Sequence, residues 1–191
     1  MRERAKSQEE TRKRIVEATM QLHEELGPRA TTISAIAEKA GVQRLTVYRH
    51  FPDETAVFQA CTAHWLSLNP PPDPASWAGI GDPREKASAA LATFYSYYAA
   101  TRRMWTVSFR DVDAVPALQG PMAEFAGFVE MVATDLAASF GSDPEGQVAA
   151  TLKHALAFPA WSDLDRLGLD NKAKVAVVGA WLAGALRSGR R

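Results

Sequence analysis

The sequence predicts an all-α protein with about nine helices. Apolar residues recur with a helical period along almost all of the 191 residues, and no stretch of useful length alternates as a β-strand would. Glycine, proline and capping residues stand at intervals that end one helix and start the next. At this length the chain is expected to bury about 70% of its extended surface on folding, enough for a core without disulfides or metals.

The first two helices are outlined by their apolar faces and their ends. The side chains at positions 15, 18, 19, 22 and 26 line one face of the first helix. Gly27-Pro28 ends it, because glycine accepts a left-handed conformation and proline cannot continue a helix. The second helix covers about 33–40, with Thr32 placed to cap it and Gly41 placed to end it.

Two further helices and a proline-rich segment follow. The third helix covers about 44–51 and stops before Pro52. The fourth runs from about Asp53 through His64. Residues 69–83 hold five of the chain's eleven prolines, and we expect them to form an extended, fairly stiff linker.

The helices after the linker are longer and less charged. Five are expected, over about 87–98, 104–112, 122–140, 148–156 and 170–187. The fourth of these is opened by Ser142-Asp-Pro-Glu145, the pattern of a capping box with Pro144 in the first turn. Pro159 is expected to kink or end it, and Asp170 starts the last helix.

The two short helices around Gly41-Val42 form the most informative stretch. A short helix, a tight glycine turn and a second short helix is the helix-turn-helix arrangement, in which the second helix enters the DNA major groove. Any small helical bundle also contains such turns, so the spacing alone leaves both interpretations open.

The composition of the second helix favours DNA. Val47 and Phe51 can face the core, which leaves a surface without any acid. That surface comprises Gln43, Arg44, Leu45, Thr46, Tyr48, Arg49 and His50. Arginine can read guanine and glutamine adenine, while tyrosine and threonine suit phosphates.

The same residues carry a family resemblance. The pattern Thr31-Thr32-Ile33-x-x-Ile36-Ala37-x-x-Ala40-Gly41-Val42-x-x-x-Thr46-Val47-Tyr48-Arg49-His50-Phe51 is similar to the signature of the tetracycline-repressor (TetR) family of bacterial transcriptional regulators. Ile15, Ala18, Leu22 and Gly27 fit that family's first helix. The similarity spans about 14–57, under a third of the chain.

The resemblance implies a homodimer with an N-terminal DNA-binding domain and a C-terminal domain that binds a small inducer. The first would cover 1–52 and the second 53–191, with a connecting helix at about 53–68. By position, Thr32, Tyr48 and His50 resemble phosphate-contacting residues. Gln43, Arg44, Thr46 and Arg49 occupy the variable places that face bases or the backbone.

The sequence departs from the family pattern at three places. Gln43 stands where serine often caps the recognition helix, and it caps poorly but reaches further. Asp53-Glu54 stands where many relatives have a lysine near a phosphate, which adds repulsion unless the acids cap the fourth helix. Leu45 stands where a small residue is common, and it could pack on a thymine methyl or shield the turn.

The last helix is apolar on every side from Val175 to Leu186. Such a helix is buried on more than one face, either in the core of one chain or against a partner chain. The resemblance favours a partner across a two-fold axis, in a bundle of four helices. The expected interface residues are Val175, Val178, Gly179, Leu182, Ala183 and Leu186.

The C-terminal helices are rich in aromatic residues. Most of these rings are expected to pack in the core. Because tyrosine and tryptophan need a polar partner when buried, we also expect an apolar inducer cavity edged by some of them. Its candidate residues are Phe94, Tyr98, Trp105, Phe109, Phe125, Phe128 and Trp161.

The net charge is zero, with 22 Lys and Arg against 22 Asp and Glu. Residues 1–68 carry ten basic and nine acidic side chains, but 29–50 carry Arg29, Lys39, Arg44 and Arg49 against Glu38 alone. The average therefore hides a local excess of three positive charges. A neutral chain with such a patch predicts modest non-specific affinity and a larger share for specific contacts.

Composition also limits the compartment. The single cysteine, Cys61, cannot form an intrachain disulfide, and the longest uncharged apolar stretch, Val175–Leu186, is shorter than the roughly 20 residues of a membrane span. No apolar signal region is visible at the N-terminus. A cytoplasmic protein without membrane contact is expected.

Enzyme chemistry has little support. Asp111-x-Asp113 and Asp163-x-Asp165 lack a Glu-x-x-His motif or clustered histidines, so solvated acids are the favoured interpretation. No nucleophile motif surrounds His154, and no phosphate loop or dinucleotide fingerprint is present. We predict no catalytic residue, no metal and no cofactor.

The predicted function is a ligand-responsive, homodimeric DNA-binding regulator. It would be a repressor that leaves a palindromic double-stranded operator when a small apolar or aromatic inducer binds. One alternative is a helical carrier or protein-interaction module that does not bind DNA. Another is a regulator whose C-terminal domain serves dimerisation alone.

Overall fold

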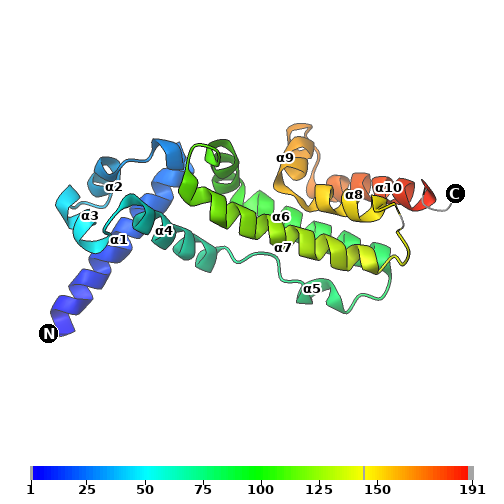
Figure 1. Ribbon diagram of the computed structural model, residues 1–191, viewed down its shortest axis with the longest axis horizontal. Helices are drawn as coiled ribbons and strands as arrows, with labels where there is room; N and C mark the ends of the chain where they lie inside the picture. Colours follow the sequence, from blue (N-terminus) through cyan, green and yellow to red (C-terminus); the bar gives the residue numbers. More distant parts are fainter. Residues whose placement is uncertain (1, 144, 189–191) are drawn as a thin grey trace. The chain divides into compact units, whose positions relative to one another are not determined.

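The computed structural model describes residues 2–143 and 145–188 and consists of helices (Figure 1). Those residues form ten α-helices and one short 3-10 helix, η1, and contain no strand. The prediction of an all-α protein is therefore confirmed, with two predicted helices joined into one and two short helices added. None of the helices in the described residues combines the length and the apolar character that a membrane span requires.

The chain divides into two compact units. The first runs to Pro70 and includes Arg102–Met122, and the second comprises Pro71–Thr101 and the residues from Ala123 onward. Helices α6 and α7 each contribute residues to both units. The functional boundary expected after residue 52 is a different kind of division and stays a prediction.

The N-terminal helices lie close to where the sequence places them, except that α1 begins well before the apolar face at positions 15–26. They are α1 (Arg2–Leu26), η1 (Pro28–Ala30), α2 (Ile33–Lys39), α3 (Arg44–His50) and α4 (Glu54–Leu68). The Ala35 N–H donates to Thr32 Oγ1 (3.2 Å), so Thr32 caps α2 as predicted. The Ala56 N–H donates to Asp53 Oδ1 (2.8 Å), so Asp53 caps α4.

One apolar cluster holds these helices together. It joins α1, α2, α3 and α4 through Ile15, Leu22, Ile33, Ile36, Val47, Phe51 and Val57, all of them buried. Helices as short as α2 and α3 are marginal in water, so their stability comes from this packing. Arg12 extends the cluster from α1, with its guanidinium carbon 4.5 Å from the centre of the Phe51 ring.

The proline-rich segment is not wholly extended, contrary to the prediction from its proline content. It contains a short helix, α5 (Ala75–Ala78), whose start is fixed by the Ala75 N–H donating to Asp73 Oδ1 (2.9 Å). Trp77 on this helix is 1% exposed, and its ring centre lies 6.1 Å from that of Phe94. Burial of a large indole is a tertiary interaction that proline content does not reveal.

The two helices expected over 87–98 and 104–112 are a single helix, α6 (Pro83–Asp111). The separation predicted between them is wrong because Ala99-Ala100-Thr101-Arg102-Arg103 contains no glycine or proline to stop a helix. The Thr101 hydroxyl donates to the Tyr97 carbonyl (2.5 Å), four residues earlier, a contact that is compatible with a continuous helix.

The remaining helices are α7 (Pro116–Ala138), α8 (Gln147–Leu156), α9 (Phe158–Arg166) and α10 (Asn171–Ser188). The capping box expected at Ser142 does not open α8. The helix starts after Gly146, which has a φ of 66°, and Asp143 Oδ2 accepts from the Ala149 N–H (3.0 Å); Pro144 lies outside the described residues. Pro159 lies in the first turn of the additional helix α9.

Two tyrosines of α6 donate hydrogen bonds to carbonyl groups at the end of α8. The Tyr95 hydroxyl donates to the Ala155 carbonyl (3.0 Å) and the Tyr98 hydroxyl to the Leu156 carbonyl (2.8 Å). Because Ala157 is extended, α8 stops there and its last carbonyls have no donor within the helix. Both tyrosines are fully buried, and burial raises the pKa of each hydroxyl, so both remain protonated donors at neutral pH.

Replacing Tyr95 with Phe should lower the free energy of unfolding by about 1–3 kcal/mol, because a buried carbonyl loses its donor. Urea unfolding followed by circular dichroism measures the change. Tyr48→Phe is the control, since Tyr48 is 41% exposed, and it should shift the value by less than about 0.5 kcal/mol. Equal stabilities for the two variants would contradict the role given to Tyr95.

The cap of α4 yields a second stability prediction. Asp53→Ala should cost about 1 kcal/mol, whereas Asp53→Asn should be close to neutral because asparagine caps as well as aspartate. Thermal or urea unfolding of both variants gives the comparison. If asparagine and alanine destabilise equally, the charge of Asp53 matters and the capping hydrogen bond does not.

Candidate nucleic-acid interface

Helix α3 has one buried side and one exposed side. Val47 is completely buried and Phe51 is 2% exposed, as the sequence predicts. The exposed side chains are those of Gln43, Arg44, Leu45, Tyr48 and Arg49, while Thr46 and His50 are half-buried. Thr32, just before α2, is also exposed. The structure thus leaves most of the predicted DNA-contacting side chains open to solvent.

The start of α3 leaves Gln43 free to reach outward. Gln43 is the N-cap residue in an extended conformation, but its side chain makes no capping hydrogen bond. Leu45 is 69% exposed, so it does not shield the turn, the second of the two roles considered for it. A long amide and an apolar side chain therefore project from the first turn of α3.

The positive charge on this surface belongs mainly to two arginines. Lys39 forms an ion pair with Glu25 (Nζ–Oε1 2.9 Å), which neutralises part of the local excess. Within the described residues, neither Arg44 nor Arg49 has an ion-pair partner, and both are exposed. They are available to a polyanion without first breaking an internal contact.

The acids after α3 have a structural explanation. Asp53 is engaged at the N-terminus of α4, where a carboxylate also interacts favourably with the helix dipole. Glu54, next to it, is exposed in the first turn. Asp53, which stands near the place where many relatives have a lysine, is thus explained by its role as the N-cap of α4.

Three of the four acids considered as metal ligands are held by basic groups, and the fourth, Asp113, is exposed. Asp163 pairs with Arg166, and Asp165 accepts from Lys174 Nζ (2.8 Å). Asp111 is 3% exposed and bonded to Arg110, so its interpretation as a solvated acid is wrong. No group of three His, Cys, Asp or Glu that could hold a metal occurs in the described residues.

The buried thiol and imidazole of the first unit are both uncharged. Cys61 Sγ lies 3.7 Å from His23 Nδ1. Burial raises the pKa of Cys61 to about 12, with a smaller contribution from Glu24, and lowers the pKa of His23 to about 4 against the opposing effect of Asp111. At neutral pH neither group supplies a nucleophile or a charge.

The predicted inducer residues fall into two groups. Phe94, Tyr98, Phe125, Phe128 and Trp161 belong to the second unit, and Trp105 and Phe109 belong to the first, with their ring centres 6.0 Å apart. Within the second unit the rings stack and tilt on one another, with centres 5.9 Å apart for Phe94 and Phe128 and for Tyr98 and Trp161.

The polar tips of Tyr98 and Trp161, two of the rings that suggested a cavity, have hydrogen-bond partners in the protein. Tyr98 donates to the Leu156 carbonyl, and Trp161 Nε1 donates to Asn171 Oδ1 (3.2 Å). A cavity of about 230 Å³ lies elsewhere, in the first unit, where His23, Phe58 and Val115 are among its lining residues. The inducer site among the aromatic residues stays a prediction.

The predicted dimer interface is partly used within the chain. Val178 is fully buried and Leu182 is 5% exposed, on the side where α10 packs against α8. Val175, Ala183 and Leu186 are half-buried, and Gly179 is exposed. Beside Gly179, Ala180 is also exposed, so small apolar residues remain on the outer side of α10. Trp181 is 39% exposed, and its ring centre lies 6.4 Å from that of His154 on α8.

Known proteins resemble this chain in its N-terminal part. Residues 15–61 match the family described as bacterial regulatory proteins, tetR family. The HTH-type transcriptional regulator SrpR of Pseudomonas putida is 41% identical over 75 residues, 38% of this chain and 35% of that protein. TtgW, also of Pseudomonas putida and described as an uncharacterized HTH-type transcriptional regulator, is 40% identical over 75 residues, 38% of this chain and 56% of that one. The chain thus matches only part of the length of these relatives.

Solved structures resemble the fold of nearly the whole chain. A TetR-like transcriptional regulator from Rhodococcus sp. RHA1 superimposes with a TM-score of 0.66 at 17% identity, covering 93% of this chain and 96% of that one. The fatty acid degradation regulator FadR from Bacillus halodurans gives a TM-score of 0.57 at 16% identity, covering 93% and 96%. The match over residues 15–61 therefore identifies the N-terminal helix-turn-helix as one of the tetR-family type. The solved structures show that nearly the whole chain has the fold of TetR-like transcriptional regulators.

Proposed function

We propose that the chain is a homodimeric repressor that binds a palindromic operator through α3 and releases it when a small apolar or aromatic ligand binds. The observation that carries the DNA-binding part is the exposed side of α3. It presents Gln43, Arg44 and Arg49 without an intervening acid, while Val47 fixes the helix to the core.

The exposed residues divide by chemistry. Arg44 and Gln43 lie at the start of α3, the end that contacts base edges in the helix-turn-helix docking mode, and they suit guanine and adenine. Leu45 beside them suits a thymine methyl. Thr32, Tyr48 and His50 are assigned to phosphates, and Thr46 and Arg49 to bases or the backbone.

A two-fold dimer matches this mode of binding. Two recognition helices must stand about 34 Å apart to enter successive major grooves. The outer side of α10 supports the pairing, because Gly179, Ala180 and Ala183 allow close approach of a partner helix. A Cβ added at Gly179 would meet nothing within 4 Å in its own chain, so that space is available to a second copy.

The ligand class follows from the second unit. Phe125 and Phe128 on α7 are half-buried beside the buried Phe94, so an apolar or aromatic ligand inserted there would exchange one ring contact for another. One structural neighbour is a fatty acid degradation regulator, which makes fatty acids a sensible first set of probes together with small aromatic acids. Release requires that the ligand prefer a geometry that does not bind DNA, transmitted in this proposal through a shift of α4.

Replacing Tyr48 and Arg49 with Ala should abolish the shift of operator fragments and leave the dimer intact, because both side chains are exposed. Fragments of the DNA that flanks the chain's own gene are the first operators to test, by gel shift or fluorescence anisotropy. Lys172→Ala on α10 removes the same charge away from α3 and is the control. Unchanged affinity of the double variant would refute the assignment of the recognition helix.

Replacing Gly179 with Glu should convert the dimer to a monomer while the helical content stays the same or rises, since glycine inside a helix costs about 1 kcal/mol relative to alanine. Sedimentation equilibrium gives the oligomeric state. Gly127→Glu on α7 is the matched control, because Gly127 is exposed, lies within a helix and has nothing within 4 Å of an added Cβ. If the Gly179→Glu variant remains a dimer and the Gly127→Glu variant does not, the interface lies on another face.

A further inference from the structure

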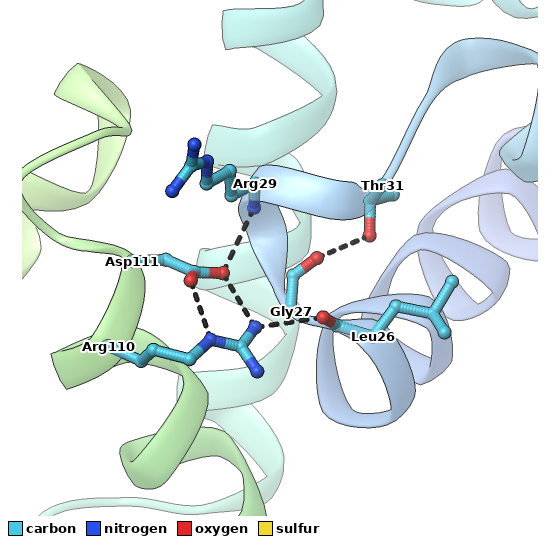
Figure 2. Close-up of polar contacts among 6 residues, drawn as sticks. All are labelled: Leu26, Gly27, Arg29, Thr31, Arg110 and Asp111. Carbon is cyan, nitrogen blue, oxygen red and sulfur yellow. Dashed lines mark hydrogen bonds and ion pairs between the residues drawn. The ribbon is translucent and has the colours of Figure 1, made fainter.

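The end of α6 is tied to the corner between α1 and α2 by two adjacent side chains. Figure 2 shows Arg110 and Asp111 facing Leu26, Gly27 and Arg29. Arg110 Nη2 donates to the Leu26 carbonyl (2.8 Å), and the Arg29 backbone N–H donates to Asp111 Oδ2 (3.1 Å). All of these residues belong to the first unit.

The arginine and the aspartate also hold each other. Arg110 donates to both carboxylate oxygens of Asp111, with distances of 2.8 Å from Nε and 3.0 Å from Nη2. The Asp111 side chain is 4% exposed, and the hydrogen bond from Arg110 lowers the pKa of its carboxyl against the opposing effect of burial. The carboxylate therefore stays charged at neutral pH and depends on Arg110 for compensation.

The corner between α1 and α2 offers this pair a free carbonyl and the space beside a glycine. Leu26 is the last residue of α1, so its carbonyl has no donor within the helix. Gly27 follows with a φ of 92°, and a Cβ at this position would collide with the Arg110 guanidinium and the Asp111 carboxylate. Gly27 is thus required twice, for its backbone conformation and for the space that the pair occupies.

The corner leads directly into the DNA-facing elements. The Thr31 hydroxyl donates to the Gly27 carbonyl (2.9 Å), and the next residue, Thr32, caps α2. Helix α2 packs against α3. The position of the corner therefore sets where α2 starts and, through that packing, how α3 is presented.

We propose that Arg110 and Asp111 are positioning residues for operator recognition, which hold the corner before α2 and so link α6 to the conformation of the helix-turn-helix. This inference rests on the proposed DNA-binding function. Neither side chain lies on α3, and both act through Leu26 and Arg29. Helix α6 begins in the second unit and ends in this contact, so the pair is the point at which a change along α6 reaches the corner.

The test compares operator binding of the full-length protein with that of Arg110→Ala, Arg110→Lys and Asp111→Ala. Both alanine variants should weaken specific binding about tenfold, the size of effect expected from losing a charged hydrogen bond. Lysine keeps the charge beside Asp111 but lacks the planar fork, so Arg110→Lys should lie between alanine and the wild type. Arg103→Ala, exposed on the same helix, is the control and should bind as the wild type does.

Two readouts separate positioning from a merely structural role. Affinity for an unrelated DNA duplex should stay within about twofold, because electrostatic contacts do not depend on precise placement of α3. A variant that only lowers stability would leave the affinity of the folded protein for the operator unchanged. Amide exchange at Arg29 should also become faster in both alanine variants, and this needs no DNA.

The outcomes are distinguishable. If the wild type binds an operator and the folded alanine variants bind it equally, the positioning role is wrong and the proposed function stands. The same conclusion follows if Arg29 exchange is unchanged. If the wild type binds no specific DNA, the proposed function fails, and the positioning role in operator recognition fails with it. Should an alanine variant not fold, Arg110→Lys decides: wild-type affinity contradicts the inference, and reduced specific affinity with unchanged non-specific affinity supports it.

Discussion

The helices that carry the DNA-facing surface have to be held from outside, because α2 and α3 span seven residues each and helices of that length are marginal alone. Val47 and Ile36 anchor them in the cluster that α1 and α4 complete. Since Val47 and Phe51 are both buried in this cluster, these two side chains decide which side of α3 is presented. Any displacement of α1 or α4 is therefore passed to α3 through the core.

Helix α6 supplies donors for the carbonyl ends of other helices in both units. Tyr95 and Tyr98 serve the end of α8, and Arg110 serves the end of α1. In each case the receiving helix stops abruptly, at an extended residue or at a glycine with positive φ, and leaves carbonyls that need a donor. One uninterrupted helix fills both roles, so its continuity through residues 99–103 matters to both units.

The sequence predicts best where the signal is local. Gly27-Pro28, Thr32 and Gly41 bound the first helices correctly because turns and caps depend on a few adjacent residues. Helix α5 is not predicted, because burial of Trp77 against Phe94 is a contact between segments apart in sequence. The roles of Arg110 and Asp111 are hidden for the same reason, since their partners lie more than 80 residues away. The one local sign of these roles is an arginine next to an aspartate at a helix end. An exposed, solvated pair of charges would look the same in the sequence.

Ion pairs within the chain reduce the number of basic side chains that are available to DNA. Of the four basic side chains between residues 29 and 50, Lys39 is paired with Glu25, and Arg29 lies close enough to Asp111 to contribute to its lowered pKa. Arg44 and Arg49 remain.

Even if both arginines neutralised phosphates in each half of the proposed dimer, a plot of the logarithm of the binding constant against that of the salt concentration would have a slope of only about −4. The slope is about −10 for a strongly electrostatic repressor. Such a protein gains little from charge alone, so its affinity has to come from the placement of α3 against the bases. A contact that fixes that placement without touching DNA, such as Arg110 with Asp111, then matters more than it would in a basic protein.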